Sequence, residues 1–311
     1  MTDKLAFVFP GQGSQSVGML AELAEAHSVV RDTFGEASEA LGYDLWELVR
    51  QGPEEALNRT DRTQPAMLAA GVAVWRVWME RDGQVPALMA GHSLGEYTAL
   101  ACAQAIRFPE AVRVVADRGR FMQEAVPEGE GAMAAVLGLD DEVIRQVCEE
   151  AAAGQVVEPV NYNAPGQVVI AGNRQAVERA LSAAERAGAK RAVELPVSAP
   201  SHCALMKPAA ERLSERLKDV EVFPPRIPVI HNVDVEMSSN PEEIRAKLVA
   251  QLHNPVRWVD TVKRLAAEGV TRAVECGPGR VLAGLNRRID RQVVTTPVYD
   301  PQSLEKALGT E

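Results

Sequence analysis

Cysteine is scarce in this chain, and long hydrophobic runs are missing. The cysteines lie far apart, without the paired spacings of zinc sites or disulfide frameworks: Cys102, Cys148, Cys203 and Cys276. We therefore predict free thiols in a reducing compartment. The longest apolar stretch, Ala66–Trp75, is far shorter than the roughly 18 residues that a membrane span requires. We predict no transmembrane helix.

Positive charge is also in deficit. The chain has 33 Lys and Arg residues against 43 Asp and Glu residues, a formal net charge of −10. An acidic chain disfavours nonspecific binding to nucleic acid or to an anionic membrane. The N-terminal segment has only one short apolar run and no cleavage-like site, so we predict no signal peptide. We expect a cytoplasmic monomer, with neither nucleic acid nor membrane as a partner.

The chain does have enough apolar material for a large core, because 46% of its 311 residues are hydrophobic. Helix-like patterns alternate with short apolar runs, which predicts a mostly parallel sheet with helices on both faces. The segment 129–197 differs from the rest. Its elements follow the order β-α-β-β-α-β of a ferredoxin-like subdomain, with predicted strands at Gly131–Leu137, Val156–Asn161, Gln167–Ala171 and Ala189–Leu195.

A serine between two glycines carries the strongest chemical signal. Ser93 is the centre of a Gly-x-Ser-x-Gly segment that follows a strand-like run (85–90) and precedes a helix-like run (94–104). Small neighbours permit a sharp turn that exposes the hydroxyl above the free N–H groups of a helix start. A purely structural Gly-Ser turn is the alternative, but the flanking strand and helix favour a nucleophile.

These patterns together predict an α/β fold in two parts. We expect a large α/β-hydrolase-like body, formed by residues 1–128 and 198–311, with a mostly parallel sheet. We expect an inserted ferredoxin-like (βαββαβ) subdomain at residues 129–197.

A serine nucleophile needs a base, usually histidine, within hydrogen-bond reach. His202 is the strongest candidate, because it lies where the small subdomain returns to the body and a helix is predicted over Ser201–Lys218. Junctions between domains commonly line ligand sites. From position alone, a surface or core histidine is an equal alternative. The remaining histidines are His27, His92, His231 and His253.

Five short segments then follow one another in register along almost the whole chain: PGQGSQ at 10–15, GHSLGE at 91–96, QVVIAG at 167–172, PSH at 200–202 and ECGPG at 275–279. In this order they resemble the malonyl-CoA:acyl carrier protein transacylases of fatty acid synthesis. Each segment alone is weak, but five in register are highly specific. The resemblance implies Ser93 as nucleophile, His202 as base, and no metal or redox cofactor.

The resemblance also implies that a backbone carbonyl, that of Gln251, orients His202. A helix from Pro241 must stop before Pro255, which puts Gln251 in a last turn whose carbonyls lack intrahelical partners. An exposed glutamine is the alternative. Because the acceptor is main-chain, a side-chain substitution here is expected to cost much less than one at His202. By the same resemblance, Gln12 and the backbone amide of Leu94 form the oxyanion hole; from the sequence alone, a structural glycine-rich turn around Gln12 is an equal alternative.

Arg118 is predicted on the apolar side of a helix that begins at Pro109. Charged residues at positions 113, 117, 120 and 124 form another face, predicted to be exposed to solvent. An arginine on an apolar side is costly unless it is paired or snorkels to the helix edge, and snorkelling is the usual explanation. The resemblance implies instead that Arg118 grips the malonyl carboxylate, which suits a planar guanidinium better than an ammonium.

Polar residues at the subdomain edge supply further candidates for substrate contacts, although they are equally typical of turns: Asn161, Asn163 and Gln167. An acidic acyl carrier protein needs a local basic patch, and the candidate patches are Lys190-Arg191 and Arg287-Arg288.

The sequence therefore predicts an acyltransferase. Its substrates are malonyl-CoA and acyl carrier protein, CoA is the released product, and a malonyl-Ser93 ester is the intermediate. The main alternative is an esterase or thioesterase of α/β-hydrolase type. That fold places its histidine near the C-terminus and uses an HGGG-type loop, whereas His202 is mid-chain. A non-catalytic carrier-docking protein is a third possibility, and the presence of both Ser93 and His202 argues against it.

Overall fold

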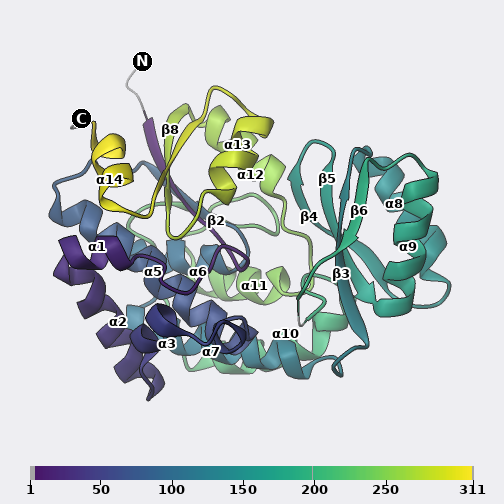
Figure 1. Cartoon of the computed structure of the whole chain (residues 1–311), viewed down its shortest axis with the longest axis horizontal. Coiled ribbons are helices and arrows are strands. Elements are labelled where there is room, and N and C mark those ends of the chain that lie inside the picture. Colours follow the sequence, from purple (N-terminus) through teal and green to yellow (C-terminus); the bar gives the residue numbers. More distant parts are fainter. Residues whose placement is uncertain (1–3, 198, 310–311) are drawn as a thin grey trace.

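The computed structural model describes residues 4–197 and 199–309; residues 1–3, 198 and 310–311, and with them the predicted boundary at 198, lie outside the described part. Two sheets organise the chain (Figure 1). The larger sheet has the strand order β7-β2-β1-β8-β9, and all of its paired strands are parallel. Its strands are β1 (Lys4–Phe9), β2 (Leu88–Gly91), β7 (Val229–Ile230), β8 (Val270–Cys276) and β9 (Val294–Val298).

Helices cover both faces of this sheet. Alternate residues of β1 point to opposite faces, because side chains alternate along a strand. Phe7 belongs to one hydrophobic cluster and Val8 to another. The first cluster contains residues of α1 (Ala21–Ala26), α2 (Ser28–Leu41), α3 (Leu45–Gln51), α4 (Glu54–Leu57), α5 (Thr60–Glu80), α6 (Leu94–Cys102), α7 (Phe108–Glu124), α10 (Lys207–Lys218), α11 (Pro241–Gln251) and α14 (Pro301–Leu308). The second contains residues of α12 (Trp258–Ala267) and α13 (Val281–Ile289).

The smaller sheet is antiparallel, with the order β4-β5-β3-β6. Its strands are β3 (Gly131–Leu137), β4 (Val157–Ala164), β5 (Gln167–Asn173) and β6 (Arg191–Glu194). One face packs against α8 (Asp141–Ala152) and α9 (Arg174–Arg186), which lie at the far right of Figure 1. On the other face, Met133 and Val169 pack against Cys203, next to the predicted base.

The motif at 275–279 has a structural role. The Glu275 carboxylate is buried at the end of β8 and accepts the backbone N–H groups of Leu282 (2.9 Å) and Ala283 (2.8 Å). These N–H groups belong to the first turn of α13, where backbone donors have no intrahelical partner. Glu275 thus ties the start of α13 to the end of β8.

Several predicted boundaries are wrong. The helix predicted over Ser201–Lys218 begins at Lys207 and is preceded only by a 3-10 turn, Ala204–Met206. The strand predicted from Val85 begins at Leu88, and Val85 is exposed. The charged face of α7 is largely exposed, as predicted: Arg113, Arg120 and Glu124 are exposed, and only Asp117 is half-buried. Asp117 accepts from Arg216 of α10 at 2.9 Å, and that arginine also pairs with α7 at Glu110.

None of the helices within residues 4–197 and 199–309 is long and apolar enough to cross a membrane. Within the same ranges, no cluster of three or more His, Cys, Asp or Glu residues could hold a metal ion.

Candidate active site

Ser93 occupies a sharp turn between β2 and α6. Its backbone has φ 52° and ψ −108°, a conformation that L-residues rarely adopt. The two flanking glycines make the turn possible. A Cβ on Gly91 would lie 1.8 Å from the carbonyl carbon of Gly95, and one on Gly95 would lie 2.0 Å from the carbonyl oxygen of Phe9. Ser93 itself remains partly exposed, so its hydroxyl is reachable.

His202 lies within hydrogen-bond reach of this hydroxyl. The distance from Ser93 Oγ to His202 Nε2 is 2.7 Å, and His202 Nδ1 lies 2.7 Å from the backbone oxygen of Gln251, the last residue of α11. The next carbonyl, that of Leu252, accepts the backbone N–H of His202 at 3.1 Å. Two carbonyls at one helix end therefore fix both the ring and the backbone of His202.

These contacts decide the tautomer of His202. A carbonyl oxygen can only accept, so Nδ1 carries the proton and Nε2 is free to accept the Ser93 hydroxyl proton. His202 is only 2% exposed. Its pKa is lowered to about 3, chiefly because it is buried and also because the positive charge of Arg118 is close, while the bond to the Gln251 carbonyl opposes both effects. His202 is therefore a neutral imidazole at neutral pH, as a base must be.

Arg118 is fully buried beside the serine, with 1% of its surface exposed, so it does not snorkel to the edge of α7. Its Nη2 donates to Ser93 Oγ (3.2 Å) and to the Gln251 side-chain oxygen (3.0 Å), and its Nη1 donates to Gln64 (2.8 Å). Within residues 4–197 and 199–309, no salt bridge to a carboxylate includes it. A buried cation without a carboxylate partner is costly, and an anionic ligand would offset that cost.

The Gln251 side chain is buried, which rules out the exposed alternative. Besides accepting from Arg118, its Nε2 donates to the backbone oxygen of Ser93 (3.0 Å) and to Glu96 (2.8 Å). The expectation that only its backbone matters is therefore too narrow.

The two predicted oxyanion donors lie around the same turn. Leu94 is the first residue of α6, where an N–H has no intrahelical acceptor. Gln12 is exposed, and its side chain donates to Thr60 at 3.4 Å. The loop that contains Gln12 packs closely against the serine turn. A Cβ on the preceding Gly11 would lie only 2.6 Å from the backbone oxygen of His92, so only glycine fits there.

The three polar candidates at the subdomain edge separate in space. Asn163 Oδ1 lies 2.8 Å from Nε2 of His92, the neighbour of Ser93. Asn161 forms a bridge to Val256, and its side-chain oxygen is buried without a hydrogen-bond partner in the described part of the chain. Gln167 accepts a hydrogen bond from Arg288 of α13 instead of contacting the serine.

Sequence reasoning missed the buried polar residues that support the site. They are Gln64, Glu96, His231 and Asn232, all almost completely buried. Only Glu96 could have been found, because it ends the GHSLGE segment and a carboxylate in an otherwise apolar helix start is unusual.

Comparison with known proteins agrees with this geometry. The model of the family described as "Acyl transferase domain" matches residues 6–297. A Salmonella typhimurium protein named malonyl CoA-acyl carrier protein transacylase is 58% identical over 305 residues, which are 98% of this chain and 99% of that protein. A Bacillus subtilis protein of the same name is 46% identical, over 99% of this chain and 97% of that protein.

Solved structures give the same result. An acyl carrier protein S-malonyltransferase from Vibrio cholerae has a TM-score of 0.96 and 56% identity, over 98% of this chain and 99% of that chain. A malonyl-transacylase solved in complex with a type II polyketide synthase acyl-carrier protein has a TM-score of 0.98 and 58% identity, over 99% of this chain and 100% of that chain. The chain belongs to the acyl transferase domain family.

Proposed function

We propose that this protein transfers a malonyl group from malonyl-CoA to the pantetheine thiol of an acyl carrier protein, and so supplies fatty acid biosynthesis. The observation that carries the proposal is the arrangement around Ser93 Oγ. His202 Nε2 lies 2.7 Å from this oxygen, and the buried guanidinium of Arg118 donates to it at 3.2 Å. The names of the relatives support the substrates.

The first half-reaction forms a malonyl ester. His202 Nε2 takes the Ser93 proton, and Oγ attacks the thioester carbon of malonyl-CoA. The C–S bond breaks, and the CoA thiolate leaves with the proton that His202 returns. The negative end of α11 and the Gln251 carbonyl stabilise the imidazolium that forms in between.

Two further groups act on the negative charge that develops on the carbonyl oxygen. We propose that the Leu94 N–H, at the start of α6, and Gln12 donate to it. Removal of one such donor in a protease of known mechanism costs about 2.7–4 kcal/mol of transition-state stabilisation.

Arg118 distinguishes malonyl from uncharged acyl groups. The malonyl carboxylate would supply the missing counter-charge of the guanidinium, whereas an acetyl group would leave it unpaired. Gln64 accepts from Nη1 and Gln251 accepts from Nη2, which holds the guanidinium in a fixed orientation.

The second half-reaction runs the same steps in reverse, with the pantetheine thiol as the attacking group. An acidic carrier protein would bind at two basic pairs, Lys190-Arg191 and Arg287-Arg288, which lie near the turn between β4 and β5. Arg288 donates to the backbone oxygen of Pro165 at 3.3 Å. Within this turn the backbone oxygen of Gly166 accepts the N–H of Gly138 at 2.8 Å, and the Lys190 side chain packs against Gly138. We propose this basic rim as the docking surface, and Asn161 and Asn163 as further substrate contacts.

The finer description of the fold belongs to the same proposal. We regard the body as α/β-hydrolase-like, because its serine turn joins a parallel strand to a helix. The strand order β4-β5-β3-β6 and the two helices on one face support a ferredoxin-like subdomain at 129–197. The proposed steps need no metal or redox cofactor. Four buried free cysteines agree with the cytoplasm.

A transfer assay separates this function from that of a thioesterase. The enzyme is incubated with labelled malonyl-CoA, with and without a carrier protein bearing pantetheine, and malonyl-carrier and free malonate are measured. We expect the label on the carrier, with little malonate. Rapid malonate release at the same rate with or without carrier would identify a hydrolase instead.

A further inference from the structure

The conformation of Ser93 needs external support. A non-glycine residue at φ 52° and ψ −108° is strained, and this conformation persists only where its surroundings over-determine it. If this support were lost, the turn would relax toward ordinary backbone angles. Ser93 Oγ would then move away from His202 Nε2, and the Leu94 N–H would change direction with it.

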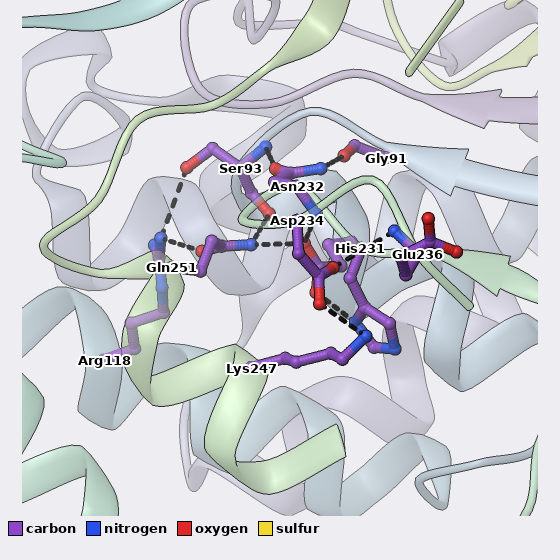
Figure 2. A network of polar contacts seen from close by, with 10 residues as sticks. Gly91, Ser93, Arg118, His231, Asn232, Asp234, Glu236, Lys247 and Gln251 are labelled. Carbon is purple, nitrogen blue, oxygen red and sulfur yellow. Dashed lines mark hydrogen bonds and ion pairs between the residues drawn. The ribbon is translucent and has the colours of Figure 1, made fainter. Parts of the chain in front are cut away.

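Asn232 spans this turn with its side-chain amide. Its Oδ1 accepts the Ser93 N–H at 2.7 Å, and its Nδ2 donates to the Gly91 backbone oxygen at 2.7 Å (Figure 2). Asn232 is completely buried, so water does not compete for either bond. The amide therefore ties the last residue of β2 to the residue that precedes α6.

The carbonyl of Ser93 is held from the other side. It accepts a hydrogen bond from Nε2 of Gln251 at 3.0 Å, also drawn in Figure 2. Two amide side chains, from the segment after β7 and from the end of α11, thus hold the N–H and the C=O of the same residue. Neither amide contacts the Ser93 hydroxyl in the described structure.

Glu96 joins the two amides. Its Oε2 accepts from the Asn232 backbone N–H (2.9 Å) and from Gln251 Nε2 (2.8 Å), and its Oε1 lies 2.7 Å from His231 Nδ1. Glu96 is completely buried. Helix α6 begins directly after Ser93 and places this carboxylate one turn beyond it. Charge-assisted bonds of this kind are short and strong, so Glu96 fixes the position of both amides.

We propose that Asn232 is a positioning residue for the acyl transfer reaction, held in place by Glu96, and that its amide maintains the reactive geometry of Ser93. The inference rests on the proposed function. Asn232 does not touch Arg118, so its loss slows attack by Ser93 without changing the preference for malonyl. A misplacement of reacting atoms by about 1 Å costs on the order of 10²-fold in rate.

The chain offers a matched control in Asn286. It is also a completely buried asparagine with two side-chain bonds, one from Trp258 (2.9 Å) and one to Thr295 (3.0 Å). Asn286→Ala loses bonds of the same kind as Asn232→Ala, but neither is made to a residue of the serine turn. The nearest link is the Trp258 ring, whose centroid lies 5.6 Å from that of the His92 ring. A purely structural role of Asn232 predicts that the two variants behave alike.

The test measures four quantities in wild type, Asn232→Ala and Asn286→Ala. These are the first-turnover rate of malonyl-Ser93 formation, the rate of Ser93 labelling by a fluorophosphonate, the malonyl-to-acetyl ratio of kcat/KM, and Tm. The fluorophosphonate phosphonylates Oγ: the O–P bond forms, fluoride leaves and His202 takes the hydroxyl proton. It carries no carboxylate for Arg118. We expect Asn232→Ala to slow both reactions at Ser93 at least tenfold with an unchanged ratio. Asn286→Ala should lower Tm comparably and change both rates less than twofold.

Equal rates in Asn232→Ala and Asn286→Ala would overturn the inference. If Asn232→Ala fails to fold, Asn232→Asp replaces it, since this variant keeps the shape and the acceptor for Ser93 but loses the donor to Gly91. We expect it to slow labelling at least threefold, and unchanged labelling would overturn the inference. A wild type that reacts with the fluorophosphonate but not with malonyl-CoA contradicts the proposed function alone, and the labelling comparison still tests Asn232.

Discussion

At the scale of single residues, the site is defined by two buried ionisable side chains, Arg118 and His202, whose hydrogen-bond partners are uncharged. Arg118 is a buried cation held by two glutamines and a serine rather than by a carboxylate. His202 is a buried imidazole held neutral by burial and by that same cation. Each arrangement costs stability in the free protein, and each is suited to the substrate proposed here.

Arg118→Ala should convert a malonyl-selective enzyme into a slow and less discriminating one. A hydrogen bond to a charged group contributes about 1.5–3 kcal/mol, so the preference for malonyl-CoA over acetyl-CoA should fall at least tenfold. Arg118→Lys should rescue only part, since an ammonium lacks the planar fork. The measurement is kcat/KM for both substrates, with Arg113→Ala on the exposed side of α7 as the control. An unchanged ratio in Arg118→Ala would contradict carboxylate binding.

The acylation rate should resist acid. Because the pKa of His202 is lowered to about 3, the imidazole stays neutral, and competent as a base, well below the ordinary histidine pKa of about 6.5. We expect the first-turnover rate in wild type to be nearly constant from neutral pH down to about pH 5. A rate that halves near pH 6.5 would show that His202 titrates normally. The variant His202→Ala should catalyse neither half-reaction, so it should show no acylation rate whose pH dependence could be followed.

At the scale of elements, the end of α11 performs two tasks. Its last carbonyls hold His202, and the Gln251 side chain connects Arg118, the Ser93 carbonyl and Glu96. The first task was implied by the resemblance to the malonyl transacylases, and the position of Pro255 beyond the helix is consistent with free carbonyls at its end. The second was not, because a glutamine in a last turn is usually exposed and its partners come from segments more than 130 residues away in sequence.

Gln251→Ala should separate these tasks. The helix end and its carbonyl remain, so the pH dependence of acylation should match that of wild type. The guanidinium loses one of its acceptors, so selectivity for malonyl should fall several-fold, although less than in Arg118→Ala. The Ser93 carbonyl loses its donor, so acylation should also slow, although less than in His202→Ala. Steady-state rates with malonyl-CoA and acetyl-CoA across a pH series measure both. Loss of activity as severe as in His202→Ala would mean that the side chain, rather than the carbonyl, is the main support of the base.

Element order was largely predictable, whereas some boundaries were not. Period-two and helical patterns identify β3, α8, β5 and α9 within a few residues, because each buries one face against its neighbours. The helix expected from Ser201 fails at its start. His202 has φ 65°, and its backbone and ring are drawn to the end of α11, which leaves no helical geometry before Ala204. The carbonyl groups of Gln251 and Leu252 thus determine the backbone conformation at His202, although the local sequence favours a helix there.

At the scale of the whole molecule, the small sheet is attached directly to the site. The backbone N–H of Tyr162, in β4, donates to the Val256 carbonyl at 3.0 Å, and the backbone N–H of Val256 donates to the Val160 carbonyl at 2.9 Å. Asn163 continues this contact to His92. The small sheet and the body therefore meet beside the serine turn, and the sequence could indicate this only through the position of His202 after residue 197.

The lowered pKa of His202 also affects the stability of the whole protein. Below about pH 6.5 the unfolded chain binds a proton at this residue that the folded chain does not, so the free energy of unfolding falls as the pH falls. His202→Gln removes this term. Between about pH 7.5 and about pH 5, the free energy of unfolding should therefore decrease in both proteins, and the decrease should be smaller in the variant by up to about 2 kcal/mol. Urea unfolding at both pH values measures the difference, and equal losses would contradict a lowered pKa.

We propose above all that Ser93 carries the malonyl group between donor and carrier. The most direct measurement is rapid mixing of the enzyme with malonyl-CoA, acid quenching, and mass spectrometry of the intact chain and its peptides, in wild type and Ser93→Ala. We expect one malonyl group on the peptide that contains Ser93, and we expect this group to disappear when carrier protein is added. A folded Ser93→Ala variant should carry no adduct. A malonyl adduct on Ser93→Ala, or one on another residue of wild type, would contradict this proposal.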